Sequence, residues 1–288
     1  MESREILAGQ ALNKALEIRR KLNIQANFPL DIYSACEQLD ITVQFVAIPS
    51  GEGMYWHEDG EARILVSAHR PLPRKVFTCG HELGHHLFDH GSTIDELEES
   101  IRRSRFDPKE FLVDCFSGFF LMPKLAVQSA FSSRNWTPAT ATPLQVFTIA
   151  CSFGVGYSTL IDHMTYALKL ITETKAKELK KSSPKNIRQG LFGELSTNPL
   201  MVVDEQWLLK TVDVEVGYQI LLPKTVQIEG DIVSFQTDTK YGRLFQADHS
   251  GLARAYCPGM NWAVNIRVSR FEYVGLSAYR HFGECDDE

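Results

Sequence analysis

Apolar and polar residues alternate with two different periods along the first third of the chain. Apolar positions up to about Leu22 recur every three or four residues, which predicts an N-terminal helix. A shorter helix is predicted from Leu30 to Leu39, and two strands are predicted over residues 41–48 and 62–68. The stretch 49–61 between these strands is rich in turn residues and predicts a connection.

Two more apolar helices are predicted further along, separated by a polar segment. The first contains residues 76–88 (VFTCGHELGHHLF), and residues 90–106 predict a charged connection. The second covers residues 107–123, where Asp107 suits the N-cap and Pro108 the first helical position. These two helices are therefore neighbours along the chain.

The character of the chain changes after about residue 175. Residues 176–197 are polar and basic and contain Ser-Ser-Pro, which predicts a linker. From there to about Val274, short β-rich segments alternate with Gly, Pro, Asp or Asn. We therefore expect an α+β protein, with a mainly helical domain and a small sheet over residues 1–175 and a smaller, mostly β domain over residues 198–288.

Composition and charge are those of an ordinary globular protein. Of the 288 residues, 44% are hydrophobic and 23% charged. The formal net charge of -6 argues against general affinity for nucleic acid or an anionic membrane. The sequence contains no apolar run long enough to span a bilayer, and the N-terminal segment alternates charged with apolar residues, unlike a secretory signal.

The cysteines point to a reducing compartment. Six cysteines are scattered along the chain without a CxxC pair. That spacing does not favour a zinc site made of thiolates. We expect reduced, mostly buried thiols and a cytoplasmic protein.

The first apolar helix carries a HExxH motif, formed by His81, Glu82 and His85. Residues four apart lie on one helix face, so two imidazoles so placed can bind one Zn²⁺ ion. Glu82 projects beside them, where it can act as the base that deprotonates the attacking water. His86 and His90 fall off the ligand face and are predicted to be ordinary polar residues near the site.

The helix that carries the motif is expected to be packed rather than free. Its apolar residues form one face: Val76, Phe77, Leu83, Leu87 and Phe88. Gly84 inside the motif costs about 1 kcal/mol of helix propensity relative to Ala, which close approach of another backbone would explain. The longer pattern HExxHxxGxxH is not met, because Phe88 and Gly91 occupy its last two defining positions.

A catalytic zinc site needs a third protein ligand and an open position. Glu110 and Asp114 lie four apart on the second helix and share a face, which we expect to be the narrow polar stripe of a buried helix. Glu110 is predicted as the third ligand, and Asp114 as the acceptor of a hydrogen bond from the distal nitrogen of a bound His. The competing acids lie in a segment expected to be solvated: Glu96, Glu98 and Glu99.

Taken together, FTCGHELGHHLFDH, KEFLVDCFSGFFLMP, PLDIYSACEQLDI and ARILVSA resemble the ImmA/IrrE family of metallopeptidases over about residues 5–170. The resemblance implies a zincin-like, gluzincin-like peptidase domain with bound Zn²⁺. In that family the third ligand is a glutamate thirteen residues before the Pro of Leu-Met-Pro, and counting back from Pro123 reaches Glu110. Phe119 and Phe120 depart from the family, which often has smaller or charged residues there.

The resemblance also implies a substrate class. Family members typically cleave a helix-turn-helix repressor encoded nearby, in a stress response or on a mobile element. We expect the strand over residues 62–68 to be an edge strand on which an extended substrate pairs. Tyr55, His57 and Tyr157 are candidate donors to the oxyanion, and the sequence does not choose among them.

Two other functions fit parts of the sequence. Residues 143–170 read as helix, Gly-containing turn and helix, so a DNA- or protein-binding regulator with a vestigial zinc site is one alternative. The few basic residues there and the intact Glu82 argue against it. A zinc hydrolase of a non-peptide substrate is the other. The β-rich domain would sense a ligand, recruit the substrate or restrain the site, or it serves only to stabilise the protein.

Overall fold

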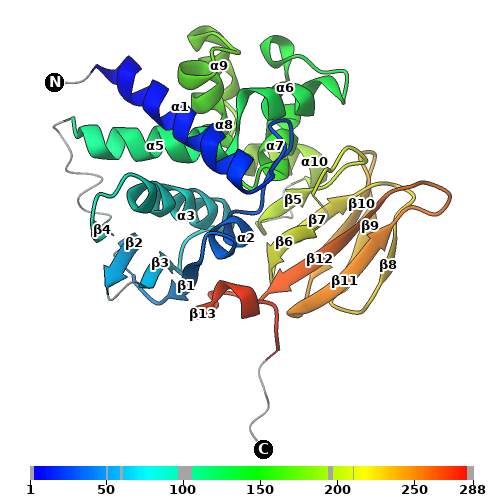
Figure 1. Cartoon of the computed structure of the whole chain (residues 1–288). Helices are drawn as coiled ribbons and strands as arrows, with labels where there is room; N and C mark the ends of the chain where they lie inside the picture. The colour runs from blue at the N-terminus through cyan, green and yellow to red at the C-terminus, as the bar shows by residue number, and fades with distance from the viewer. Residues whose placement is uncertain are drawn as a thin grey trace, which may run out of the picture. The chain divides into compact units, whose positions relative to one another are not determined.

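The computed structural model describes residues 3–49, 51–58, 61–96, 106–193, 197–209 and 211–283. The chain divides into two compact units. Unit 1 comprises Met1–Ser129 and Glu272–Ala278, and unit 2 comprises Ala130–Phe271 and Tyr279–Glu288. Helices and small sheets occur in the same chain (Figure 1), which confirms the expected α+β class.

The helices of unit 1 match those predicted. They are α1 (Arg4–Lys21), α2 (Ile32–Glu37), α3 (Leu72–Leu87) and α5 (Pro108–Leu121). Asp31 caps α2 by accepting from the backbone N–H of Tyr33, and Asp107 caps α5 by accepting from Lys109 and Glu110, as predicted for Asp107. These caps fix where α2 and α5 begin.

Arg19 connects α1 to α5 from inside the core. Its Nη1 donates to the Phe120 carbonyl at 2.6 Å, and its Nη2 donates to the carbonyls of Gln25, at 2.8 Å, and Phe28. Burial lowers the pKa of Arg19 to about 10. The guanidinium therefore satisfies three backbone carbonyls and holds α1 against α5, the helix that carries Glu110.

A five-stranded sheet lies beside α3. Its strand order is β13-β1-β3-β2-β4, and α3 packs against β2 and β3 (Figure 1). β1 and β3 are parallel, and the other neighbours are antiparallel. The strands are β1 (Ile41–Val46), β2 (Gly51–Glu58), β3 (Glu61–Ser67), β4 (Thr93–Glu96) and β13 (Gly275–Leu276).

Three predictions about this sheet are wrong. Most of the predicted connection 49–61 is strand β2, and the connection 90–106 contains strand β4. β3 pairs with β1 on one side and β2 on the other, so it is an interior strand, and the predicted edge on residues 62–68 does not exist. Backbone groups on both of its sides are already hydrogen-bonded, which leaves no room for an extended substrate.

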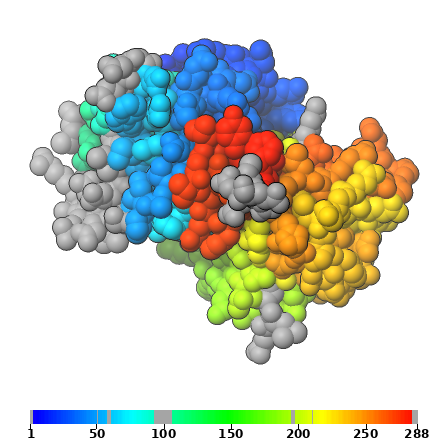
Figure 2. Space-filling model, turned by 90° about the horizontal axis from the view of Figure 1, so that it is seen from below, coloured from blue at the N-terminus to red at the C-terminus, as the bar shows by residue number. Residues whose placement is uncertain are grey.

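The last strand of the sheet comes from the far end of the chain. Residues near Val274 were expected in the C-terminal β domain, but Gln44 and Phe45 of β1 pair with Leu276 and Gly275 of β13. Figure 2 shows this C-terminal segment in red beside the blue residues of the N-terminal part. The pairing joins residues more than two hundred positions apart, which no local pattern reveals.

Unit 2 combines short helices with two four-stranded sheets. The helical segments from the unit boundary onward are α6 (Lys124–Ser132), a 3-10 turn (Pro138–Thr140), α7 (Pro143–Ser152), α8 (Tyr157–Asp162), a π-helical turn (His163–Ala167), α9 (Glu173–Leu179) and α10 (Pro184–Phe192), with a further 3-10 turn at Ser277–Tyr279. One sheet has the order β5-β7-β10-β9 and the other β6-β12-β11-β8. The strands are β5 (Leu200–Val202), β6 (Thr211–Glu215), β7 (Gln219–Leu222), β8 (Gln227–Glu229), β9 (Val233–Asp238), β10 (Arg243–Ala247), β11 (Gly251–Tyr256) and β12 (Ala263–Ser269).

The division into units differs from the predicted domain boundaries of 1–175, 176–197 and 198–288. The units divide between Ser129 and Ala130, and helix α10 lies within the predicted linker. The reason is packing, because α7 contacts both β5 and α10. The polar, basic composition of this stretch reflects exposed helix faces and a capped helix start, where Ser183 accepts from the backbone N–H of Asn186.

An ion cluster ties the β-rich part of unit 2 together. Asp213 on β6 accepts from Arg267 on β12 at 2.5 and 2.6 Å and from Arg280 at 3.0 Å. Burial alone would raise the pKa of Asp213, but the two guanidinium groups hold it below its ordinary value. The parallel pair β6–β12 is thus reinforced by side chains as well as by backbone hydrogen bonds.

No single helix in the described residues is long and apolar enough to cross a membrane; α7 and the α8 segment meet the criterion only as a pair, bent by 101°. The described cysteines are all free thiols, four buried and Cys115 partly exposed. Cys36 and Cys79 lie with their Sγ atoms 3.8 Å apart in the core of unit 1. Cys285 lies outside the described residues.

Candidate metal centre

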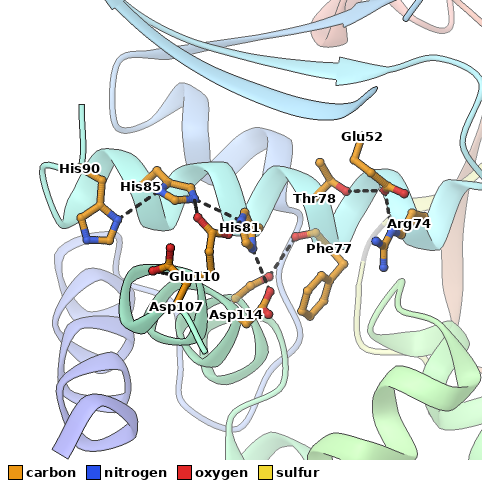
Figure 3. Close-up of polar contacts among 11 residues, drawn as sticks. Glu52, Arg74, Phe77, Thr78, His81, His85, His90, Asp107, Glu110 and Asp114 are labelled. Carbon is orange, nitrogen blue, oxygen red and sulfur yellow. Dashed lines mark hydrogen bonds and ion pairs between the residues drawn. The ribbon is translucent and has the colours of Figure 1, made fainter. Parts of the chain in front are cut away.

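Helix α3 presents different residues to its two neighbours. His81 and His85, one turn apart, point toward α5 (Figure 3). Thr78 and Glu82 instead face Gly53 of β2. Both histidine side chains are almost completely buried, and Glu82 has no exposed surface. The HExxH spacing therefore directs the imidazoles to one side of the helix and the carboxylate to another, as i and i+4 periodicity requires.

Two glycines let α3 and α5 approach closely. A Cβ at Gly80 would lie 2.6 Å from Ser117 Oγ, and one at Gly84 would lie 2.9 Å from Val113 Cβ and 3.2 Å from Phe116 Cδ1. The predicted reason for Gly84 was close approach of another backbone. The neighbours are side chains of α5 instead, and their proximity brings Glu110 within reach of the histidines.

Gly84→Ala is expected to destabilise the protein although alanine is the better helix former. The added methyl group overpacks the interface with Val113 at a cost of about 1–3 kcal/mol, against a propensity gain of about 1 kcal/mol. Urea unfolding of the metal-free protein measures the balance. Gly9→Ala is the matched control, because Gly9 is an exposed position of α1 with open space around it, and this change is expected to stabilise.

The same substitution measured in a protein that already carries Val113→Ala tests whether the Val113 side chain causes the destabilisation. With Val113→Ala already in place, the Cβ that crowds residue 84 remains but the branched methyl groups are gone. Adding Gly84→Ala is then expected to cost less than it does in the wild type. An equal cost in both backgrounds would show that the branched methyl groups of Val113 are not the cause.

Three ligand atoms converge on one position between α3 and α5. His81 Nε2 and His85 Nε2 lie 3.2 Å apart, His81 Nε2 lies 3.3 Å from Glu110 Oε2, and His85 Nε2 lies 3.6 Å from Glu110 Oε1 (Figure 3). This is the group of His, Cys, Asp and Glu side chains in the described residues that could hold a metal ion. His81, His85 and Glu110 are the three residues predicted as ligands from the sequence.

The spacing of this triad fits zinc. Bonds of about 2.0–2.1 Å in a tetrahedral site place ligand atoms about 3.3–3.4 Å apart, close to the observed separations. Two nitrogens and one carboxylate leave a fourth position open, as catalytic zinc sites require. Glu110 stands in the first turn of α5, where the helix dipole also favours a negative charge.

Asp114 lies where a partner of a metal-bound histidine is expected. His81 Nδ1 and Asp114 Oδ1 are 2.9 Å apart, so the ring can donate to the carboxylate from the nitrogen that faces away from Glu110. Such a bond fixes the tautomer and orientation of a metal ligand. Asp114 itself is largely exposed, so its carboxylate keeps contact with solvent.

Glu82 is confined by a glycine of the neighbouring strand. A Cβ at Gly53 of β2 would lie 3.0 Å from Glu82 Oε1 and 2.5 Å from Thr78 Cγ2. Thr78 in turn donates to Glu52, whose carboxylate also accepts from Arg74 at 2.6 Å. Gly53 was part of the segment predicted as a connection, so its role in making room for Glu82 was missed.

The candidate oxyanion donors have other contacts. Tyr55 is buried with its hydroxyl 2.8 Å from His86 Nδ1, and His57 stacks beside the Tyr55 ring. Burial, reinforced by Asp89, raises the pKa of Tyr55, so its hydroxyl stays protonated. Tyr157 belongs to unit 2, where its hydroxyl donates to the Leu179 carbonyl at 2.9 Å.

The structure describes the two other histidines near the motif fully, but the competing acids only in part or not at all. Glu98 and Glu99 lie outside the described residues, and of Glu96 only the backbone, in β4, is described. His86 is off the ligand face, as predicted. His90 was predicted to be an ordinary polar residue, but it contacts a candidate ligand: its Nδ1 lies 3.1 Å from His85 Nδ1.

Two imidazoles and a carboxylate around one open position, with a glutamate on the same helix, are typical of catalytic zinc sites. Residues 36–164 match the family model Peptidase_M78, described as the IrrE N-terminal-like domain. The match begins in α2, contains α3 and α5, and continues past the unit boundary into the π-helical turn after α8. A comparison with curated proteins finds no match. The resemblance to the ImmA/IrrE family is thus confirmed over this segment, and the chain carries an IrrE N-terminal-like peptidase domain.

Proposed function

We propose that this protein is a zinc-dependent endopeptidase whose metal is held by His81, His85 and Glu110. The observation that carries the proposal is the convergence of two buried histidines and the partly exposed Glu110 within a segment that matches a peptidase family. A zinc ion bound there would act as a Lewis acid, polarising the scissile carbonyl and lowering the pKa of water to about 7.

Glu82 serves as the general base in this proposal. Its carboxylate takes the proton of the attacking water and returns it to the leaving nitrogen of the cleaved peptide bond. Burial of the side chain and contact with Gly53 restrict its motion, which keeps the carboxylate in position for the transfer.

The substrate is proposed to pair with the free edge of the sheet. β4 follows the C-terminus of α3 and pairs with β2 on one side, and in the described part of the chain it has no strand on the other. An extended peptide can add to such an edge through backbone hydrogen bonds. We therefore assign substrate pairing to β4 and not to β3, the strand for which the sequence predicted it.

The family resemblance supports a regulatory protein, such as a helix-turn-helix repressor, as the substrate. It also supports a cytoplasmic role in a stress response or in control of a mobile element. The 101° bend between α7 and the α8 segment fits a helix-turn-helix in unit 2, but residues 157–168 contain no Lys or Arg. DNA binding is therefore the weaker proposal.

Metal-dependent cleavage tests the proposal. The wild-type protein is incubated with a purified helix-turn-helix repressor encoded beside its gene, and fragments are identified by mass spectrometry. We expect cleavage that stops with a zinc chelator and returns when about one equivalent of zinc is restored, since one triad holds one ion.

A second probe separates peptide from non-peptide hydrolysis. The same preparations are incubated with p-nitrophenyl acetate, whose hydrolysis reports a zinc hydrolase without peptidase specificity. Zinc-dependent ester hydrolysis with every candidate repressor left intact would favour the non-peptide hydrolase. A protein that binds no zinc but binds duplex DNA in a salt-dependent manner would favour the regulator.

A further inference from the structure

Helix α3 ends in a turn that folds the chain back onto the last metal ligand. The backbone N–H of His90 donates to the His85 carbonyl at 3.1 Å, and that of Asp89 donates to His86 at 3.2 Å. Asp89 has a left-handed conformation with φ of 53°. These two bonds and the positive φ define a Schellman motif, in which the second residue beyond the helix returns to its last turn.

The motif brings the ring of His90 against the ring of His85. Their Nδ1 atoms are 3.1 Å apart, and their ring centroids are 5.2 Å apart (Figure 3). The ring of His90 also stacks on the ring of Phe88, with the two centroids 6.0 Å apart, which restricts rotation of the His90 ring. Phe88 in turn packs edge-on against Phe116 of α5. The position of His90 is therefore set by the backbone turn and by an aromatic contact.

The two nitrogens of His85 have different partners. Nε2 faces His81 and Glu110, so it is the nitrogen available to a metal. A neutral imidazole that binds metal through Nε2 carries its proton on Nδ1, and that proton needs an acceptor. Nδ1 of His90 stands at hydrogen-bonding distance, and it accepts when the proton of the His90 ring is on Nε2.

We infer that His90 is a positioning residue for the metal centre: it accepts a hydrogen bond from His85 Nδ1–H and thereby fixes the tautomer and orientation in which His85 Nε2 faces the metal. The inference rests on the proposed zinc site. It gives each histidine ligand its own acceptor, Asp114 for His81 and His90 for His85.

The geometry of the contact fits this role. His90 meets Nδ1 of the His85 ring, whereas Glu110 faces Nε2 of that ring, so His90 acts through His85 rather than as a ligand in its own right.

Variants at His90 test the hydrogen bond separately from the packing. His90→Phe keeps a ring beside Phe88 but has no acceptor, and zinc affinity, measured by competition with a chromophoric chelator, is expected to fall about 10–100-fold. His90→Asn places an amide oxygen near the position of Nδ1, and its affinity is expected to stay close to that of the wild type. The visible spectrum of the Co²⁺-loaded protein should change with Phe and be preserved with Asn.

Control measurements distinguish a positioning role from a structural one. Thermal unfolding of the metal-free variants should match that of the wild type, because the bond matters for the bound tautomer. Asp89→Gly, which suits the left-handed turn, should leave zinc affinity unchanged. If His90→Phe fails to fold, His90→Ala takes its place, with the same expected loss.

The possible failures are distinguishable. A wild-type protein that binds no zinc would overturn the proposed function and this inference together. Tight binding by the wild type and equally tight binding by His90→Phe would overturn only the inference. Equal weakening by Phe and Asn would also overturn it, because shape rather than an acceptor would then be required.

Discussion

Glu82→Gln is expected to abolish proteolysis while leaving zinc in place. The substitution keeps the shape of a side chain that has no exposed surface and lies against Gly53, so the fold of α3 should be unchanged. An amide cannot take a proton from water, and loss of a general base costs about 10²–10⁴-fold in rate. The repressor-cleavage rate and the zinc content of the same preparation are the two measurements.

The chain offers a matched control for this change. Glu52 is also a buried glutamate on β2, but its carboxylate accepts from Thr78 and Arg74, which lie one and two turns before Glu82 on α3. Glu52→Gln should keep both zinc and most of the activity. Cleavage at near wild-type rate by Glu82→Gln would remove Glu82 from the mechanism. Loss of zinc in that variant would instead make the carboxylate part of the metal centre.

Local patterns were sufficient to predict the helices that carry the proposed metal ligands. The HExxH spacing specifies one helix face, and Asp107 with Pro108 specifies where the second helix begins. The contact between Glu110 and the histidines followed from a polar stripe on an otherwise apolar helix. Each of these inferences depends on residues close together in the sequence, where helix periodicity and capping act.

The sheet could not be predicted in the same way. Gly51 and Gly53 gave β2 the composition of a turn, although Gly53 is needed where the strand passes over Thr78 and Glu82. The interior position of β3 depends on β1 and β2 together, and β1 is itself flanked by β13 from the other end of the chain. Strand neighbours of this kind are set by long-range pairing, so a period of two along one segment cannot reveal them.

His90 shows why spacing alone missed a residue of the site. On an ideal helix it lies five positions after His85 and points elsewhere. The left-handed turn at Asp89 ends the helix and returns His90 to the last turn. Asp tolerates that conformation less readily than Gly but more readily than most residues, so the sequence contained only a weak signal for the turn.

The third ligand is the point on which the metal centre depends most. Glu110→Ala is expected to lower zinc affinity by more than about 10²-fold, since loss of an outer hydrogen-bond partner alone costs about 10–100-fold. Two histidines remain in that variant, and two ligands do not hold zinc in the presence of a competing chelator. Metal analysis after dialysis against chelator should find about one equivalent in the wild type and much less in Glu110→Ala.

A variant with an expected intermediate loss of zinc affinity serves as the control, because it separates loss of a ligand from loss of a hydrogen-bond partner. Asp114 lies one turn after Glu110 and contacts His81 through the distal nitrogen, so Asp114→Ala should weaken zinc binding without removing it. Glu110→Ala could still bind stoichiometric zinc while Glu98→Ala or Glu99→Ala loses it. That result would show that the third ligand is one of these two acids and not Glu110. The order of affinities, wild type above Asp114→Ala above Glu110→Ala, is what the distances between α3 and α5 require.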